Sequence, residues 1–254
     1  MTSERKGIIV ILLLLLVVSI AVLMQEPMAQ SLEYHQFSDN RVMLSVPNFL
    51  NVASNLAFVF VGIMGLYGLN KRKLVGLTEL KAGYFLLFLG VFLVGLGSGY
   101  YHLSPSNQTL VWDRLPMTVS FMSLYAIILA EYVSVELGRR LLYPLLLLGC
   151  ASVFYWHYTE GQGAGDLRFY FLVQYLPLIT IPVILLFLKP AFSHGSSYWW
   201  LILSYVAAKV FEHFDAEVFD ALFLISGHTL KHLVAAFGIL LLILGYQKRA
   251  KLPG

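Results

Sequence analysis

Charged side chains are scarce in this sequence. Asp, Glu, Lys and Arg together make up 12% of its 254 residues, whereas an ordinary soluble domain is about one quarter charged. The formal net charge is only +3, and no run of like charges suggests a surface for nucleic acid. This shortage argues against a soluble domain and gives no reason to expect a nucleic-acid partner.

Cysteine is almost missing as well, because Cys150 is the single one in the chain. It cannot form an internal disulfide, and it says little about the redox compartment. Its surroundings, "LLLLGCASVF", favour a small apolar residue on a helix. The sequence also lacks internal repeats, low-complexity tracts and any linker that would divide it.

Hydrophobic residues, in contrast, make up 59% of the chain, and the mean hydropathy is +0.76. A bilayer core of about 30 Å requires roughly 20 apolar residues in a helix. Eight segments approach that requirement and predict an all-α membrane protein: 8–24, 48–69, 82–103, 115–137, 141–157, 169–188, 198–213 and 226–246.

The first of these segments allows two interpretations. The basic start "MTSERK" followed by an apolar run is compatible with a cleaved signal peptide. The run is long for a signal peptide, however, and no clear small-x-small site follows it, so we favour an uncleaved anchor. We therefore expect residues 1–24 to be an N-terminal helix and residues 25–254 to form the main transmembrane domain.

The distribution of basic residues predicts the orientation, since Lys and Arg accumulate on the cytoplasmic side. With the N-terminus inside and eight alternating spans, both termini are cytoplasmic. The inner segments then hold 12 of the 17 basic residues: Arg5, Lys6, Lys71, Arg72, Lys73, Lys81, Arg139, Arg140, Lys189, Lys248, Arg249 and Lys251.

This topology brings three histidines to the outer ends of their spans. His102 ends the third span, and His228 and His232 lie in the first turns of the last. Two histidines four residues apart share one helix face and can chelate a metal ion. A third histidine would complete a three-ligand site, in which Zn²⁺ keeps its fourth position for water and lowers the pKa of that water to about 7.

Two further polar residues reach the same depth, and each has a simpler interpretation. Asp113 could cap the next helix or pair with Arg114, and it could also exchange a proton as a general base and acid. Ser98 shares a helix face with His102. It could be a small packing residue, or its hydroxyl could stabilise an oxyanion.

Other polar groups on this side could also be ligands or partners of ligands. Lys209 with Glu212 or His213 could form an internal ion pair. Lys231, between the two histidines in sequence, is expected to face elsewhere on the helix, toward lipid headgroups.

The sequence resembles the alkaline ceramidase family, within the CREST superfamily of membrane hydrolases and receptors. The resemblance lies in the pattern Ser-x-x-x-His at the end of one span, an Asp just before the next span, and His-x-x-x-His in the last span. The segments "SGYYHLSPSNQTLVWDRLPMTVSFMSL", "SGHTLKHLVAA" and "PNFLNVASNLAFVFVG" carry the resemblance, which runs from about residue 34 to 246.

The resemblance implies a seven-helix bundle around a lipid-sized cavity, here with one extra N-terminal transmembrane helix. It implies zinc ligands at His102, His228 and His232, proton transfer by Asp113 and oxyanion stabilisation by Ser98. Eukaryotic members also bind Ca²⁺ through an acidic segment before the first core span. The segment here is less acidic. For a possible Ca²⁺ site, Asp39 could contribute an oxygen ligand, and Asn48 stands where a carboxylate would be expected.

The resulting hypothesis is a zinc-dependent hydrolase of ceramide, or of a similar lipid amide, acting near the extracytoplasmic face. It would release a sphingoid or other amine and a fatty acid. Hydrolysis of a non-sphingoid N-acyl lipid is one alternative, and a lipid-binding receptor without turnover is another. The short tails outside the spans favour the enzyme. Membrane lipids are the only other partners that the sequence suggests.

Overall fold

The computed structural model describes residues 2–253, and these residues fold into helices joined by short loops. The secondary structure in that range is helical apart from two isolated β-bridges, Met43 with Val46 and Phe192 with Lys251. The helices are α1 (Ser3–Leu23), η1 (Leu32–His35), α2 (Phe49–Ser54), α3 (Leu56–Asn70), η2 (Thr78–Leu80), α4 (Lys81–Leu103), α5 (Asn107–Tyr132), α6 (Val135–Gly161), α7 (Arg168–Phe187), α8 (Ser196–His213), α9 (Asp215–Leu222) and α10 (Gly227–Lys248).

Seven helical segments in the described chain are long and apolar enough to cross a membrane, and the first is α1. They correspond to seven of the eight predicted spans, which confirms an all-α, multi-pass membrane protein. The remaining predicted span, 198–213, forms the helix α8 but is not among the seven. Its Lys209, Glu212 and His213 make it more polar, and it packs along α10.

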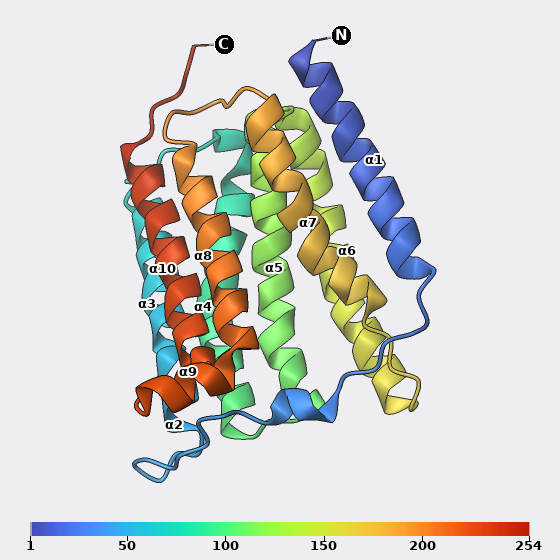
Figure 1. Ribbon diagram of the computed structural model, residues 1–254. Helices are drawn as coiled ribbons and strands as arrows, with labels where there is room; N and C mark the ends of the chain where they lie inside the picture. Colours follow the sequence, from blue (N-terminus) through green and yellow to red (C-terminus); the bar gives the residue numbers. More distant parts are fainter. Residues whose placement is uncertain (1, 254) are drawn as a thin grey trace.

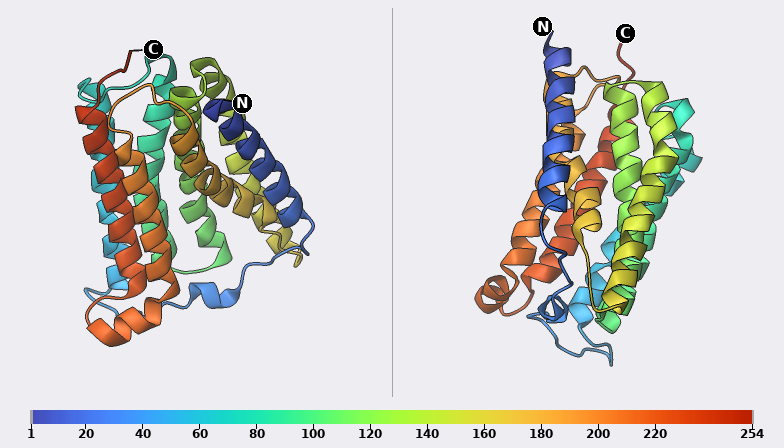
Figure 2. Two further views of the ribbon diagram at one scale, coloured as in Figure 1. Left: turned by 45° about the horizontal axis from the view of Figure 1, so that its top comes forward. Right: turned by 90° about the vertical axis from the view of Figure 1, so that its right-hand side faces the viewer.

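The helices form one bundle with two distinct ends. Figure 1 shows both termini at the top, while η1, α2 and α9 lie at the bottom. Helix α1 lies at the edge of the bundle against α7, and the left view of Figure 2 shows it at one side of the molecule. Only Gly7 and Ile11 of α1 are buried, so most of its apolar surface is free to contact lipid.

Helix α5 begins earlier than the sequence suggests. Ser106 is its N-cap, and the side chains of Ser106 and Thr109 form a reciprocal capping box with each other's backbone N–H groups. This motif satisfies otherwise unpaired N–H groups and fixes the first turn. One interpretation of the sequence made Asp113 a helix cap. The structure corrects it, because Asp113 lies in the second turn of α5.

Glycines allow α4 and α5 to approach closely. A Cβ atom on Gly97 would lie 1.9 Å from the backbone oxygen of Trp112, and one on Gly90 would lie 2.4 Å from Ser120 Oγ. Small residues at helix contacts in membrane proteins permit such backbone proximity. The contact at Gly97 brings Ser98, the next residue, close to the segment of α5 that carries Asp113.

Candidate metal centre and adjoining cavity

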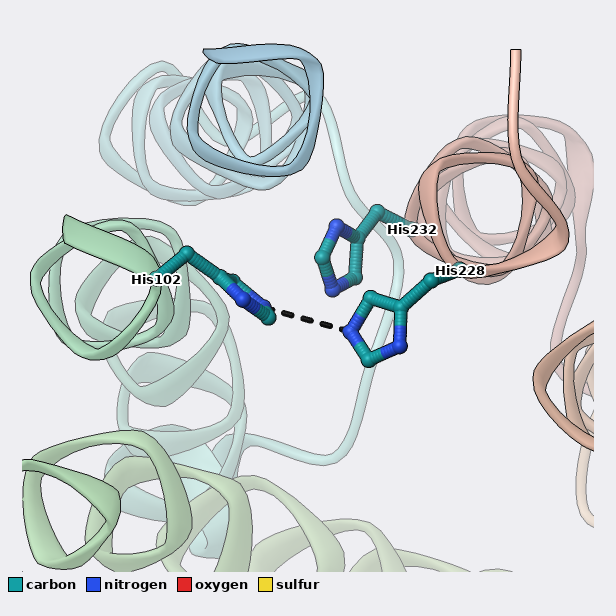
Figure 3. A group of neighbouring side chains, drawn as sticks. All are labelled: His102, His228 and His232. Carbon is teal, nitrogen blue, oxygen red and sulfur yellow. Dashed lines mark hydrogen bonds between the residues drawn. The ribbon is translucent and has the colours of Figure 1, made fainter. Parts of the chain in front are cut away.

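Three histidines from two helices converge at the lower end of the bundle. His102 comes from the last turn of α4, and His228 and His232 come from the first two turns of α10. Figure 3 shows the three rings pointing toward one another, with the Nε2 atoms of His102 and His228 at 3.3 Å. One ligand atom from each residue lies within 4.8 Å of the other two, and all three residues are buried.

The surroundings of the rings fit a metal ion. The Nε2 atoms of His102 and His228 face each other in a buried space and have no other hydrogen-bond partner among the described residues. The Nδ1 atom of His232 is 2.8 Å from the hydroxyl of Ser54, which leaves its Nε2 atom available. Three imidazoles are a common ligand set for Zn²⁺ and also suit other divalent transition metals. The cluster could therefore hold a divalent metal ion, as the spacing predicts.

Polar residues around the histidines hold the start of α10 against its neighbours α2 and α9. Asn51 Oδ1 accepts a hydrogen bond from the hydroxyl of Thr229 at 2.7 Å, and Asp215 Oδ1 accepts one from the backbone N–H of His228 at 2.6 Å. Together with Ser54, these side chains tie α2 and α9 to the start of α10. Partners of this kind orient metal ligands and tune the metal.

Sequence analysis did not single out Ser54 or Asn51. Their signal is present, because both are polar residues three apart at the start of an apolar span, in "PNFLNVASNLAFVFVG". Polar side chains within a membrane span tend to face the bundle interior. What the sequence does not show is which of the neighbouring helices they face.

A cavity of about 410 Å³ adjoins the histidine cluster. Its walls include Ser98, Asp113 and His232, so the structure brings both predicted catalytic residues to one space beside a predicted metal ligand. This volume lies within the range of small-molecule sites. The structure supports the placement of Ser98 and Asp113, while their roles in a reaction remain predictions.

The remainder of the cavity wall is mostly apolar and runs along the helices into the bundle. On α4 it extends from Ser98 to Leu87, eleven residues along the helix, which corresponds to roughly 16 Å of helix rise. Phe58, Leu124 and Ile239 line the deeper part. An elongated apolar space with polar groups at one end suits a molecule with a long apolar chain.

The polar end of the cavity contains a half-buried cluster of charged side chains. Glu212 accepts from Lys209 at 2.6 Å and from Lys231 at 2.6 Å. The first contact confirms the predicted ion pair within α8. The second corrects the expectation that Lys231 faces lipid headgroups, since its side chain is 16% exposed and lines the cavity.

The segment before α2 carries Asp39 and Asn48, the two residues considered for a calcium site. Both carboxylate oxygens of Asp39 accept from Arg41, with distances of 2.7 and 2.8 Å, and this guanidinium lowers the pKa of Asp39 below its ordinary value. The side-chain amide of Asn48 donates to the backbone oxygen of His102 at 2.8 Å. The contact of Asn48 holds the segment against α4, and a calcium site there stays a prediction.

Two comparisons with known proteins bear on the family of this chain. A search of curated proteins found no match to the chain. The family model described as Ceramidase matches residues 38–248, a range that includes α2 to α10 and every residue of the histidine cluster. Ceramidase membership implies an amidohydrolase with a ceramide-like substrate. Because the match covers most of the sequence, the chain belongs to the Ceramidase family.

Proposed function

We propose that this protein is a zinc-dependent membrane hydrolase that cleaves the amide bond of a long-chain N-acyl lipid. The products would be an amine, a sphingoid base in the case of ceramide, and a free fatty acid. The single observation that carries the proposal is the junction of the three-histidine cluster with a lipid-sized apolar cavity. Family membership supports the same reaction class.

His102, His228 and His232 would hold the zinc ion. Three histidine ligands leave one position open in the tetrahedral coordination of zinc, which is typical of catalytic sites. Bound zinc would supply activation of a water molecule and polarisation of the scissile carbonyl. The hydrogen bond between Ser54 and His232 Nδ1 would present the opposite ring nitrogen, Nε2, to the metal.

Asp113 is the candidate proton carrier. Its carboxylate lines the cavity beside His232, where it would accept a proton from the attacking water and deliver it to the leaving amine nitrogen. Proton transfer by a positioned carboxylate typically contributes about 10²- to 10⁴-fold to the rate. Without this transfer the amine would leave as an anion, which is a poor leaving group.

Ser98 is the candidate oxyanion stabiliser. Its side chain is 3% exposed and lies on the cavity wall one helical turn from His102. In that position its hydroxyl would donate a hydrogen bond to the carbonyl oxygen as negative charge develops there. Such a donor is most effective where the cavity excludes water, and the apolar walls that receive the acyl chain provide that exclusion.

The proposal is tested by incubating the purified protein with ceramide, simpler long-chain N-acyl amides and the corresponding esters. We expect release of fatty acid from an amide, and we expect Asp113→Asn to lower kcat by about 10²- to 10⁴-fold while metal content is retained. Asp220→Asn, in the exposed part of α9, is the matched control. Binding of amides without turnover would contradict hydrolysis and favour a receptor.

We further propose that the histidine end of the bundle faces the extracytoplasmic side. The support is the positive-inside distribution of Lys and Arg, together with the common location of both termini at the opposite end (Figure 1). Labelling of a cysteine introduced at exposed Phe223 by an impermeant thiol reagent in intact cells tests this orientation. Labelling only after lysis would contradict it.

A further inference from the structure

The charged side chains at the polar end of the cavity have hydrogen-bonding capacity that the protein does not use. Lys209 and Glu212 come from the last two turns of α8, and Lys231 comes from the first two turns of α10. Each lysine makes one hydrogen bond in the described part of the chain, at 2.6 Å to a different oxygen of Glu212. All three side chains line the cavity.

This capacity is open to a ligand. An ammonium group has three N–H donors, and each carboxylate oxygen accepts more than one hydrogen bond, so both lysines keep unused donors and Glu212 keeps acceptor capacity. The side chains of Lys209, Glu212 and Lys231 are 35%, 18% and 16% exposed. Because they lie on the cavity wall, a polar group of a bound molecule can reach both kinds of site at once.

The charges of this cluster leave no deficit for a charged ligand to fill. Lys209 and Lys231 share the carboxylate of Glu212, and Asp113 supplies a second carboxylate on the same wall. Two cations therefore stand with two anions. The unused donors and acceptors suit a neutral polar group better than an ion.

The remaining cation on the wall, Arg114, is balanced from the other side. It does not pair with the adjacent Asp113, contrary to one interpretation of the sequence, and its Nη2 atom donates to the side chain of Gln30. The backbone N–H of Gln30 donates in turn to Glu160. Because that carboxylate accepts only from neutral N–H groups in the described chain, its charge offsets that of Arg114.

We propose that Lys209, Glu212 and Lys231 select substrates that carry a hydroxyl group on the amine part of the amide. A hydroxyl group both donates and accepts, so it donates to Glu212 and accepts from a lysine. The inference rests on the proposed function, because it assigns residues that choose the substrate of the same site. The sphingoid part of ceramide bears such hydroxyls, so the inference agrees with the substrate that family membership implies.

The position of the cluster determines which part of the substrate it contacts. Lys231 directly precedes the metal ligand His232, and Asp113, assigned to the leaving amine nitrogen, lines the same end of the cavity. Away from this end the wall becomes apolar, toward Leu87 and Ile239, and receives the acyl chain. The amine part of the substrate therefore lies beside the cluster, with its hydroxyl close to the amide nitrogen.

The test compares two probes that differ in one group: N-palmitoylethanolamine has a terminal hydroxyl where N-palmitoylpropylamine has a methyl group. For metal-loaded wild-type protein we expect a higher kcat/KM for the hydroxyl probe. Equilibrium binding, measured in the Asp113→Asn background to prevent turnover, should show the same preference. Glu212→Gln should lower both ratios by about 10- to 100-fold, as expected for a lost hydrogen bond to a charged group.

Lys209→Met is the second variant, because it removes one donor and leaves the pair of Glu212 and Lys231 intact. It should lower both ratios by a smaller factor, since Lys231 still offers a donor. If Glu212→Gln does not fold, Lys209→Met decides the question. Lys248→Met, the same substitution at an exposed site near the other end of α10, is the matched control.

The outcomes separate this inference from the proposed function. Hydrolysis of both probes with equal kcat/KM, or with a ratio that neither variant alters, overturns the inference and leaves the hydrolase. Hydroxyl-selective binding that depends on the cluster, without turnover of either probe, supports the inference and overturns the hydrolase. A third probe, N-(2-hydroxypalmitoyl)propylamine, carries its hydroxyl on the acyl part. If that hydroxyl gives an equal preference that depends on the cluster, the cluster does not recognise the amine part and the inference is wrong.

Discussion

At the scale of single residues, the metal centre depends on side chains that touch the ligands as well as on the ligands. His102, His228 and His232 were predicted from their spacing and from the topology, and they converge as expected. Ser54 was not predicted, although its hydroxyl contacts His232 Nδ1 at 2.8 Å. Its contribution is open to direct measurement.

We predict that Ser54→Ala weakens metal binding without abolishing it. Loss of the hydroxyl leaves His232 Nδ1 unpaired in a buried site, so the ring is less firmly oriented toward the metal. Loss of such a partner typically costs about 10- to 100-fold in metal affinity. Competition with a chelator of known affinity measures the change.

The matched control is Ser152→Ala. Ser152 is also buried in a helix, but its hydroxyl bonds to the backbone of Gly149 in α6, away from the histidines. Equal metal affinity in the Ser54 variant and in wild-type protein would show that this hydrogen bond does not support the site.

At the scale of elements, the site is assembled by helix contacts that the sequence indicates only in part. The existence of each apolar helix could be predicted from hydropathy, because apolar runs of sufficient length are a strong local signal. Helix ends were less predictable: α5 begins at Asn107, not near residue 115, because a capping box formed by Ser106 and Thr109 fixes it. The expectation that Lys231 faces lipid headgroups was wrong because its partner, Glu212, belongs to a different helix.

Gly97 provides a test of the α4–α5 contact. In Gly97→Ala the new methyl group would lie 1.9 Å from the backbone oxygen of Trp112, so the helices must separate and Ser98 moves relative to Asp113. We expect a loss of about 1–3 kcal/mol of stability and a fall in kcat on the order of 10²-fold, since small misplacements at a reacting centre are costly. Thermal unfolding in detergent and a hydrolysis assay measure the two effects.

Gly99→Ala is a close control for this experiment. It introduces the same methyl group two residues away on the same helix, where no atom lies within 4 Å. If both alanine variants retain wild-type activity and stability, the close contact at Gly97 does not position the site.

At the scale of the whole molecule, a second buried polar cluster joins the helices at the end of the bundle that carries the termini. Arg249 and Glu131 form an ion pair at 2.9 Å with side chains 2% exposed, and the hydroxyls of Tyr84 and Tyr198 donate to the same carboxylate. These residues join α4, α5 and α8 to the segment after α10. No local pattern predicts this cluster, since its members are scattered along the chain and only the folded bundle brings them together.

We predict that Arg249→Met strongly destabilises the bundle. The change leaves the carboxylate of Glu131 buried without its counterion, and removal of one partner of a buried pair typically costs about 3–5 kcal/mol. The double variant Glu131→Gln with Arg249→Met should recover part of this loss, because no charge is then left unpaired. Thermal unfolding of the single and double variants measures both effects. A single variant as stable as wild-type protein would contradict a structural role for the pair.

The most direct test of the metal-dependent site is the amount of metal bound per chain, measured by elemental analysis of purified protein. The histidine geometry predicts about one zinc ion per chain in wild-type protein and in His194→Ala, which changes an exposed histidine outside the cluster. His228→Ala should lose the metal together with amide hydrolysis. A wild-type protein that hydrolyses its substrate at full rate after the metal has been removed would contradict the proposed mechanism.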